Sequence, residues 1–152
     1  MKVFLVDDSV QVIQRLSRMI AALPGVVVMG QASDIPAALQ AIRAESPDVV
    51  VLDLHLPSGS GIKVLQMIKR EKPATKVIVH TNYAFPQYQK KCIESGAVAF
   101  LDKSKDFDKI PRVIEELARH QRSRGKRSAA SALKSPRTLG LRSPARIPPR
   151  PA

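Results

Sequence analysis

Three carboxylates, a hydroxyl group and an ammonium group each follow or end a short apolar run, although they are scattered through the chain. The residues are Asp7, Asp8, Asp53, Thr81 and Lys103. Carboxylate oxygens suit a hard divalent cation, whereas an ammonium group and a hydroxyl suit the oxygens of a phosphoryl group. If the fold brings these residues together, they form a site that can hold both a cation and a phosphoryl group.

The apolar runs that carry these residues predict the strands of a buried parallel sheet. Strands are expected over residues 3–6, 26–30, 49–52, 76–81 and 97–101. Short apolar runs that are bounded by polar residues are typical of strands covered on both faces. In a doubly wound sheet the loops after such strands meet at one edge, so we expect the polar residues to gather there.

Helical patterns alternate with the predicted strands. Ser9 and Asp34 are expected to cap the first two helices, because their side chains can accept a hydrogen bond from the first turn. A third helix follows the loop 56–61, a weaker one covers residues 86–94, and the last begins near Asp108. Five strand–helix units predict an α/β fold, a three-layer sandwich around a five-stranded parallel sheet.

The charge of the chain is distributed unevenly. Residues 1–118 carry all 13 acidic residues and 15 of the 25 Lys and Arg, whereas residues 119–152 carry the other 10 and no acid. The single cysteine, Cys92, excludes an internal disulfide and favours a reducing compartment. No apolar run is long enough for a membrane span or a signal peptide. We therefore expect a cytoplasmic protein.

The patterns of strands and helices stop near His120. We predict a folded domain over residues 1–120 and a basic tail, rich in Pro, Ser and Arg, over residues 121–152. Residues 119–152 contain five prolines and only isolated aliphatic residues. Such a segment cannot bury enough apolar surface to offset an ordering entropy of about 1–2 kcal/mol per residue. The tail is therefore expected to be disordered.

Over residues 1–120 the sequence resembles the receiver domain of bacterial two-component response regulators. Three local motifs carry the resemblance, in the correct order and spacing: Phe4-Leu5-Val6-Asp7-Asp8-Ser9, Asp53-Leu54-His55-Leu56-Pro57-Ser58-Gly59-Ser60-Gly61 and Gly96-Ala97-Val98-Ala99-Phe100-Leu101-Asp102-Lys103. The resemblance implies a doubly wound, flavodoxin-like sheet with strand order 2-1-3-4-5.

The resemblance also implies a phosphoacceptor and a magnesium site. Asp53 would accept a phosphoryl group from a kinase histidine and form an acyl phosphate. Asp8, Asp53 and the backbone carbonyl of His55 would bind Mg²⁺ directly, and Asp7 would act largely through water. Mg²⁺ suits this role because it prefers oxygen ligands and keeps several waters.

The remaining residues of the motifs are implied to sense the phosphoryl group. Lys103 would offset its charge, and the Thr81 hydroxyl would donate a hydrogen bond to one of its oxygens. Phe100 matches an aromatic position whose ring turns inward when Thr81 moves. Phosphorylation would thereby shift two populations that partners distinguish, typically at the face made by the fourth helix, fifth strand and fifth helix.

The sequence departs from the family pattern at four positions near the site. Asn82 stands where the family usually has a small residue, so phosphotransfer could be slower or the acyl phosphate better shielded. Ser104 stands where many members have a proline after a cis bond. His55 and Tyr83 occupy variable positions that tend to set the lifetime of the acyl phosphate.

Other polar residues favour structural roles. Asp7, Asp8 and Asp53 could be ordinary loop charges favoured by helix dipoles, but their joint match with the motifs argues against this. His55, His80 and His120 lack the spacing of a metal-binding set. His80 is expected to be partly buried with its hydrogen bonds satisfied, and Cys92 is expected to fill space rather than act as a redox thiol.

The sequence predicts a stand-alone response regulator that is a phosphoacceptor switch rather than an enzyme. Only self-phosphotransfer and autodephosphorylation are expected as activities. The expected partners are a histidine kinase or a histidine phosphotransfer protein and a downstream protein target, and phosphorylation could drive homodimerisation. Two alternatives stay open: a transcription-associated regulator whose basic tail binds nucleic acid, and a phosphorelay shuttle that passes the phosphoryl group to another histidine.

Overall fold

The computed structural model describes residues 1–133. Met1–His120 form one compact unit, and the chain from Gln121 belongs to a second. Residues 134–152, which hold most of the predicted tail, lie outside the described residues. Within residues 1–133 no helix combines the length and the apolar character that crossing a membrane requires.

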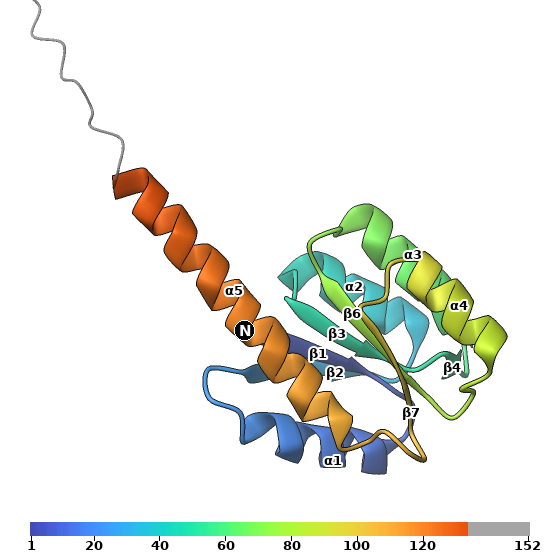
Figure 1. The fold of residues 1–152 in the computed structure, drawn as a ribbon. Coiled ribbons are helices and arrows are strands. Elements are labelled where there is room, and N and C mark those ends of the chain that lie inside the picture. The colour runs from blue at the N-terminus through green and yellow to red at the C-terminus, as the bar shows by residue number, and fades with distance from the viewer. Residues whose placement is uncertain (134–152) are drawn as a thin grey trace, which may run out of the picture. The chain divides into compact units, whose positions relative to one another are not determined.

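Five parallel strands form one sheet in the order β2-β1-β3-β6-β7, as Figure 1 shows. The strands are β1 (Lys2–Val6), β2 (Val27–Ala32), β3 (Val49–Leu52), β6 (Lys76–Thr81) and β7 (Ala99–Asp102). Counted among these five strands alone, the order is 2-1-3-4-5. The predicted doubly wound, flavodoxin-like fold is therefore confirmed.

Helices cover both faces of the sheet. Side chains of α1 (Val10–Ala21) and the first part of α5 (Lys109–Leu133) form the core on one face. Those of α2 (Ile35–Glu45), α3 (Gly61–Glu71) and α4 (Pro86–Glu94) form the core on the other. The strands read as continuous apolar runs because successive side chains enter opposite cores, and both cores are closed to water.

The predicted helix caps are confirmed. The Ser9 hydroxyl accepts a hydrogen bond from the Val12 amide at 3.4 Å, and an Asp34 carboxylate oxygen accepts one from the Ala37 amide at 2.9 Å. Each bond satisfies an amide that the helix itself leaves without a partner. The caps fix where α1 and α2 begin, and hence the course of the loops at the ends of β1 and β2.

The loop after β3 contains a small hairpin that the sequence did not predict. β4 (His55–Leu56) pairs antiparallel with β5 (Gly59–Ser60), and α3 begins directly afterwards at Gly61. A Cβ atom at Gly61 would lie 2.3 Å from the backbone oxygen of Asp53. Only glycine fits at this crossing, which brings the start of α3 against the chain at Asp53.

The prediction of a disordered tail from residue 121 is wrong for residues 121–133, because α5 continues as a helix to Leu133. All five prolines counted in the basic segment lie at or after Pro136. Residues 121–133 are mostly Arg, Lys, Ala, Ser and Gln, and their one Gly does not exclude a helix. The average composition of residues 119–152 was therefore a poor guide to residues 121–133, which contain no helix-breaking proline.

We predict that Gly61→Ala lowers the free energy of unfolding by about 1–3 kcal/mol, the usual cost of forcing an atom into a packed region. Gly125→Ala is the matched control, because a Cβ atom at Gly125 meets nothing within 4 Å. Urea unfolding of the two variants would test the prediction. A Gly61→Ala variant as stable as the unchanged protein would contradict the close crossing at Asp53.

Candidate functional site

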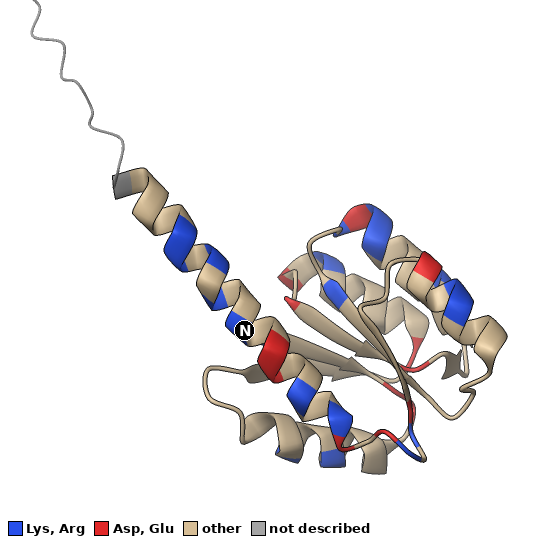
Figure 2. Cartoon of the chain, viewed as in Figure 1, with Lys and Arg blue, Asp and Glu red and all other residues tan. Residues whose placement is uncertain are grey.

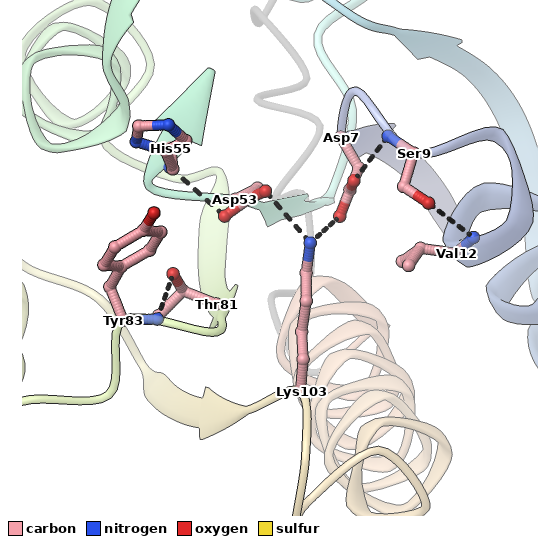
Figure 3. A network of polar contacts seen from close by, with 8 residues as sticks. All are labelled: Asp7, Ser9, Val12, Asp53, His55, Thr81, Tyr83 and Lys103. Carbon is pink, nitrogen blue, oxygen red and sulfur yellow. Dashed lines mark hydrogen bonds and ion pairs between the residues drawn. The ribbon is translucent and has the colours of Figure 1, made fainter. Parts of the chain in front are cut away.

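The carboxyl ends of four strands bring the predicted site residues together. Asp7 follows β1, Asp53 follows β3, Thr81 ends β6 and Lys103 follows β7. Figure 3 shows the side chains of Asp7, Asp53 and Lys103 directed toward one another, with Thr81 nearby. The sequence predicted this meeting correctly, because parallel strands place their carboxyl ends at one edge.

Asp7, Asp8 and Asp53 form an acidic cluster. One carboxylate oxygen from each residue lies within 4.8 Å of the others, and this is the one such group of potential metal ligands within residues 1–133. The residues Asp7 and Asp53 are only 4% and 5% exposed, whereas Asp8 is exposed. The cluster thus has two acids sheltered from water and one that faces it.

Lys103 joins the two buried acids. Its Nζ lies 2.6 Å from Asp7 Oδ2 and 2.9 Å from Asp53 Oδ2. Burial alone would lower the pKa of the Lys103 ammonium, but the bonds to Asp7 and Asp53 outweigh it and raise that pKa above its ordinary value. Lys103 is therefore a permanent positive charge between the two carboxylates.

Both oxygens of Asp7 already have donors. The Ser9 amide donates to Oδ1 at 2.9 Å, and Lys103 binds Oδ2. Burial nevertheless raises the pKa of Asp7, and the contacts with Lys103 and Ser9 offset only part of this effect. Asp7 is therefore better placed to hold Lys103 in position than to offer a free oxygen to a metal ion.

Asp53 is held in a similar way but faces the cavity of the site. The His55 amide donates a hydrogen bond to Asp53 Oδ1 at 3.2 Å, and Lys103 donates to Oδ2 at 2.9 Å. A cavity of about 270 Å³ opens beside them, lined by Asp8, Ser9, Val12, Asp53, His55, Asn82, Tyr83 and Lys103. Ser9 was predicted only as a helix cap, and its place directly after Asp8 is the signal that it would line the site.

Tyr83 lines the cavity, and its backbone contacts Thr81. Thr81 is fully buried, and its hydroxyl oxygen accepts a hydrogen bond from the Tyr83 amide at 3.1 Å. The Tyr83 ring lies against the His55 ring, with centroids 4.9 Å apart and planes tilted by 37°. This ring pair connects the loop after β3 with the loop after β6 across the cavity.

The loop after β7, which contains Ser104, is closed by side-chain hydrogen bonds. Asp102 Oδ1 accepts hydrogen bonds from the Ser104 amide at 2.8 Å and from the Ser104 hydroxyl at 2.6 Å. No cis peptide bond occurs within residues 1–133. The Asp102–Ser104 contacts fix the turn that carries Lys103.

Phe100 and Cys92 both contact the core beside α2, α3 and α4. Phe100 is partly buried against this core, so its ring has contacts in the present position, and its switching role stays a prediction. Cys92 is fully buried, and burial raises the pKa of its thiol. The structure therefore confirms that Cys92 fills space.

The expectation for His80 is wrong. The residue is 1% exposed rather than partly buried, and neither ring nitrogen has a hydrogen-bond partner within residues 1–133. Its ring lies edge-on to Phe107, with centroids 4.8 Å apart, in the core beneath the site. Burial lowers the pKa of His80 to about 4, and the charges of Lys103 and Arg15 act in the same direction.

Comparison with known proteins gives a consistent result. The family model of the response regulator receiver domain matches residues 3–115. Response regulator GacA of Pseudomonas aeruginosa is 29% identical over 121 residues, which cover 80% of this chain and 56% of the relative. The chain spans between about half and three fifths of the length of the curated relatives it matches first.

Two solved structures show the same fold. A two-component response regulator of the LuxR family from Aurantimonas sp. SI85-9A1 has a TM-score of 0.72 and 32% identity, covering 77% of this chain and 84% of that one. A CheX-CheY-BeF3-Mg²⁺ complex from Borrelia burgdorferi has a TM-score of 0.71 and 26% identity, covering 77% and 88%.

We predict that stability depends on the protonation of His80. The ordinary pKa of 6.5 applies in the unfolded chain and a pKa of about 4 in the folded one. Between these values the unfolded state binds more protons, so the free energy of unfolding falls as the pH falls from about 6.5 to 4. The loss is on the order of 3 kcal/mol.

His80→Phe is the matched variant, because it keeps an aromatic ring and removes the titrating group. Urea unfolding at several pH values should show a weaker pH dependence for this variant over the same interval. Equal pH dependence of the two proteins would mean that His80 is not held neutral in the folded state.

Proposed function

Since the chain belongs to the response regulator receiver domain family, we propose that it is a phosphorylation-controlled switch in which Asp53 accepts a phosphoryl group. The observation that supports this most strongly is the position of Asp53 in a cavity, with a permanent cation 2.9 Å from one of its oxygens. The donor is a histidine kinase or a histidine phosphotransfer protein. Because both act in the cytoplasm, we place the protein there.

The transfer needs a nucleophile and charge compensation. A carboxylate oxygen of Asp53 forms a bond to phosphorus while the phosphorus–nitrogen bond of the donor's phosphohistidine breaks, which leaves an acyl phosphate on Asp53. The incoming oxygens bring negative charge next to a buried carboxylate. Lys103 is already placed to offset this charge. A cationic group that first had to move into position would add a reorganisation cost to the transfer.

The acidic cluster fits Mg²⁺. Its donors are oxygens from three carboxylates within 4.8 Å of one another, which is the donor type that Mg²⁺ prefers. Asp8 and Asp53, with the His55 carbonyl, would hold the ion, because Asp8 and Asp53 line the cavity of the site. Asp7 is not among the residues that line the cavity and would act through water. When bound, the ion supplies positive charge to the phosphoryl oxygens.

Thr81 and Phe100 are proposed to report the modification. The Thr81 hydroxyl can donate a hydrogen bond to a phosphoryl oxygen while its oxygen accepts one from the Tyr83 amide. A shift of Thr81 toward the phosphoryl group frees space for Phe100, which lies beside the buried core. The changed face of α4, β7 and α5 then binds a downstream target or a second copy of the chain.

His55, Tyr83 and Asn82 are proposed to control the lifetime of the acyl phosphate. The His55–Tyr83 ring pair and the Asn82 side chain line the cavity through which water must reach Asp53. Intrinsic autodephosphorylation is therefore the one hydrolytic activity we assign to the protein, which otherwise acts as a switch and not as an enzyme with its own substrate.

We predict that Asp53→Asn abolishes phosphorylation, because an amide nitrogen and oxygen do not replace the carboxylate nucleophile. The full chain with Mg²⁺ and acetyl phosphate should gain one phosphoryl mass, measured on the intact protein. Glu45→Gln is the control, because Glu45 is an exposed acid at the end of α2 that does not line the cavity, and its replacement should leave labelling intact. Equal labelling rates for Asp53→Asn and the unchanged protein would show that another residue accepts the phosphoryl group.

We also predict that Asp8→Asn weakens Mg²⁺ binding more than Asp7→Asn does. Asp8 offers oxygens that face water, whereas Asp7 is engaged by Lys103 and the Ser9 amide. Calorimetric titration with MgCl₂ would compare the variants, after urea unfolding has shown that each is folded. A larger loss for Asp7→Asn would reverse the two assignments.

A further inference from the structure

The second part of α5 carries positive charge that the phosphoacceptor site does not use. Residues 121–132 contain no acidic residue and four basic ones, namely Arg122, Arg124, Lys126 and Arg127. Every residue of this stretch is exposed, and no ion pair within residues 1–133 involves any of the four. In Figure 2 the end of the described helix is blue and tan, without red.

We propose that residues 121–132 of α5 form a binding surface for duplex DNA, with the helix in the major groove and the four basic side chains on phosphates. At about 100° per residue, Arg122 and Lys126 lie on one side of the helix. Arg124 and Arg127 lie together roughly 150° away around the axis. The helix thus carries a pair of cations on each of two flanks.

The two flanks match the shape of B-form DNA. Its major groove admits an α-helix and has a phosphate backbone along each wall, so both pairs of cations can be used at once. The major groove of duplex RNA is too deep and narrow for side chains to read. Apart from Gln121 at its start, the other residues of the stretch are Ser, Gly and Ala, whose small size permits close approach.

An anionic membrane fits the same stretch poorly. A helix that lies in a membrane surface needs a broad apolar face with large side chains. Here the only apolar side chains are those of Ala129, Ala130 and Ala132. A flat anionic surface would also contact one pair of cations and leave the other unused.

Helix formation and DNA binding should reinforce one another. Arg122 and Lys126 are four residues apart on the same side, and like charges at this spacing destabilise a helix. Phosphates that neutralise these charges remove the repulsion. DNA affinity should therefore depend on the helical state of the stretch and not only on its charge.

Gly125 allows this dependence to be tested at constant charge. A Cβ atom there meets nothing within 4 Å, so Gly125→Ala adds helix propensity without a new contact. Gly125→Pro breaks the helix in the middle of the basic stretch. Fluorescence anisotropy of the full chain with a labelled duplex of random sequence would compare both variants with the unchanged protein.

Gly125→Ala should bind DNA more tightly, by at most about fivefold, which is the effect expected from helix propensity. Gly125→Pro should bind about tenfold or more weakly, because the flanks no longer belong to one helix. Equal affinities of the three proteins would overturn the proposal, since a polycation without required structure gives that result.

Charge variants locate the contacts. Replacing Arg122, Arg124, Lys126 and Arg127 with Gln should reduce the slope of log affinity against log salt by about 3.6, or 0.9 per phosphate contact. The control replaces four exposed basic residues elsewhere, Lys63→Gln, Arg70→Gln, Lys91→Gln and Lys105→Gln, and should leave the slope unchanged. A second variant replaces the basic residues after residue 133 with Gln, namely Lys134, Arg137, Arg142, Arg146 and Arg150. If this variant loses DNA binding while the slope of the helix variant is unchanged, binding belongs to residues 134–152 and the proposal is overturned.

Binding to phosphatidylserine vesicles without binding to DNA would overturn it as well.

Discussion

Two buried carboxylates within a few ångströms of each other require a positive charge, and Lys103 supplies it. The ammonium group lies 2.6 Å from Asp7 and 2.9 Å from Asp53, and the three side chains are less than a tenth exposed. Leaving such acids without a cation costs about 3–5 kcal/mol. The same contacts that stabilise the site therefore place a cation beside Asp53. Any group that changes the charge on Asp53 therefore also changes the electrostatic interactions among Asp7, Asp53 and Lys103.

The packed sheet fixes the positions of these three side chains. Asp7, Asp53 and Lys103 follow β1, β3 and β7. Buried side chains hold β1 and β3 on both faces, and β7 at the sheet edge contributes buried Leu101 to one core and partly buried Phe100 to the other. The close crossing at Gly61 and the Asp102–Ser104 bonds hold the adjoining loops. The packed sheet and the hydrogen-bonded loops together keep Asp53 and Lys103 at contact distance before any phosphoryl donor arrives.

The strands, their order and the meeting of the five polar residues could be predicted, since each depends on local apolar runs and on a motif set that fixes the topology. The β4–β5 hairpin could not, because two-residue strands leave no periodic signal. His80 was misjudged because a strand-end position does not reveal how deeply Phe107 and the helices cover it. The helical residues 121–133 were missed because their composition was averaged with that of a proline-containing segment after them.

The most direct measurement is to locate the phosphoryl group itself. The full chain would be labelled with acetyl phosphate and Mg²⁺ and treated with borohydride, which reduces an aspartyl phosphate to homoserine. Peptide sequencing by mass spectrometry would then identify the position. Homoserine at residue 53, and unchanged aspartate at residues 7 and 8, is the expected result. Homoserine at either of those acids, or none at residue 53 in a labelled protein, would contradict the role of Asp53 as the phosphoacceptor.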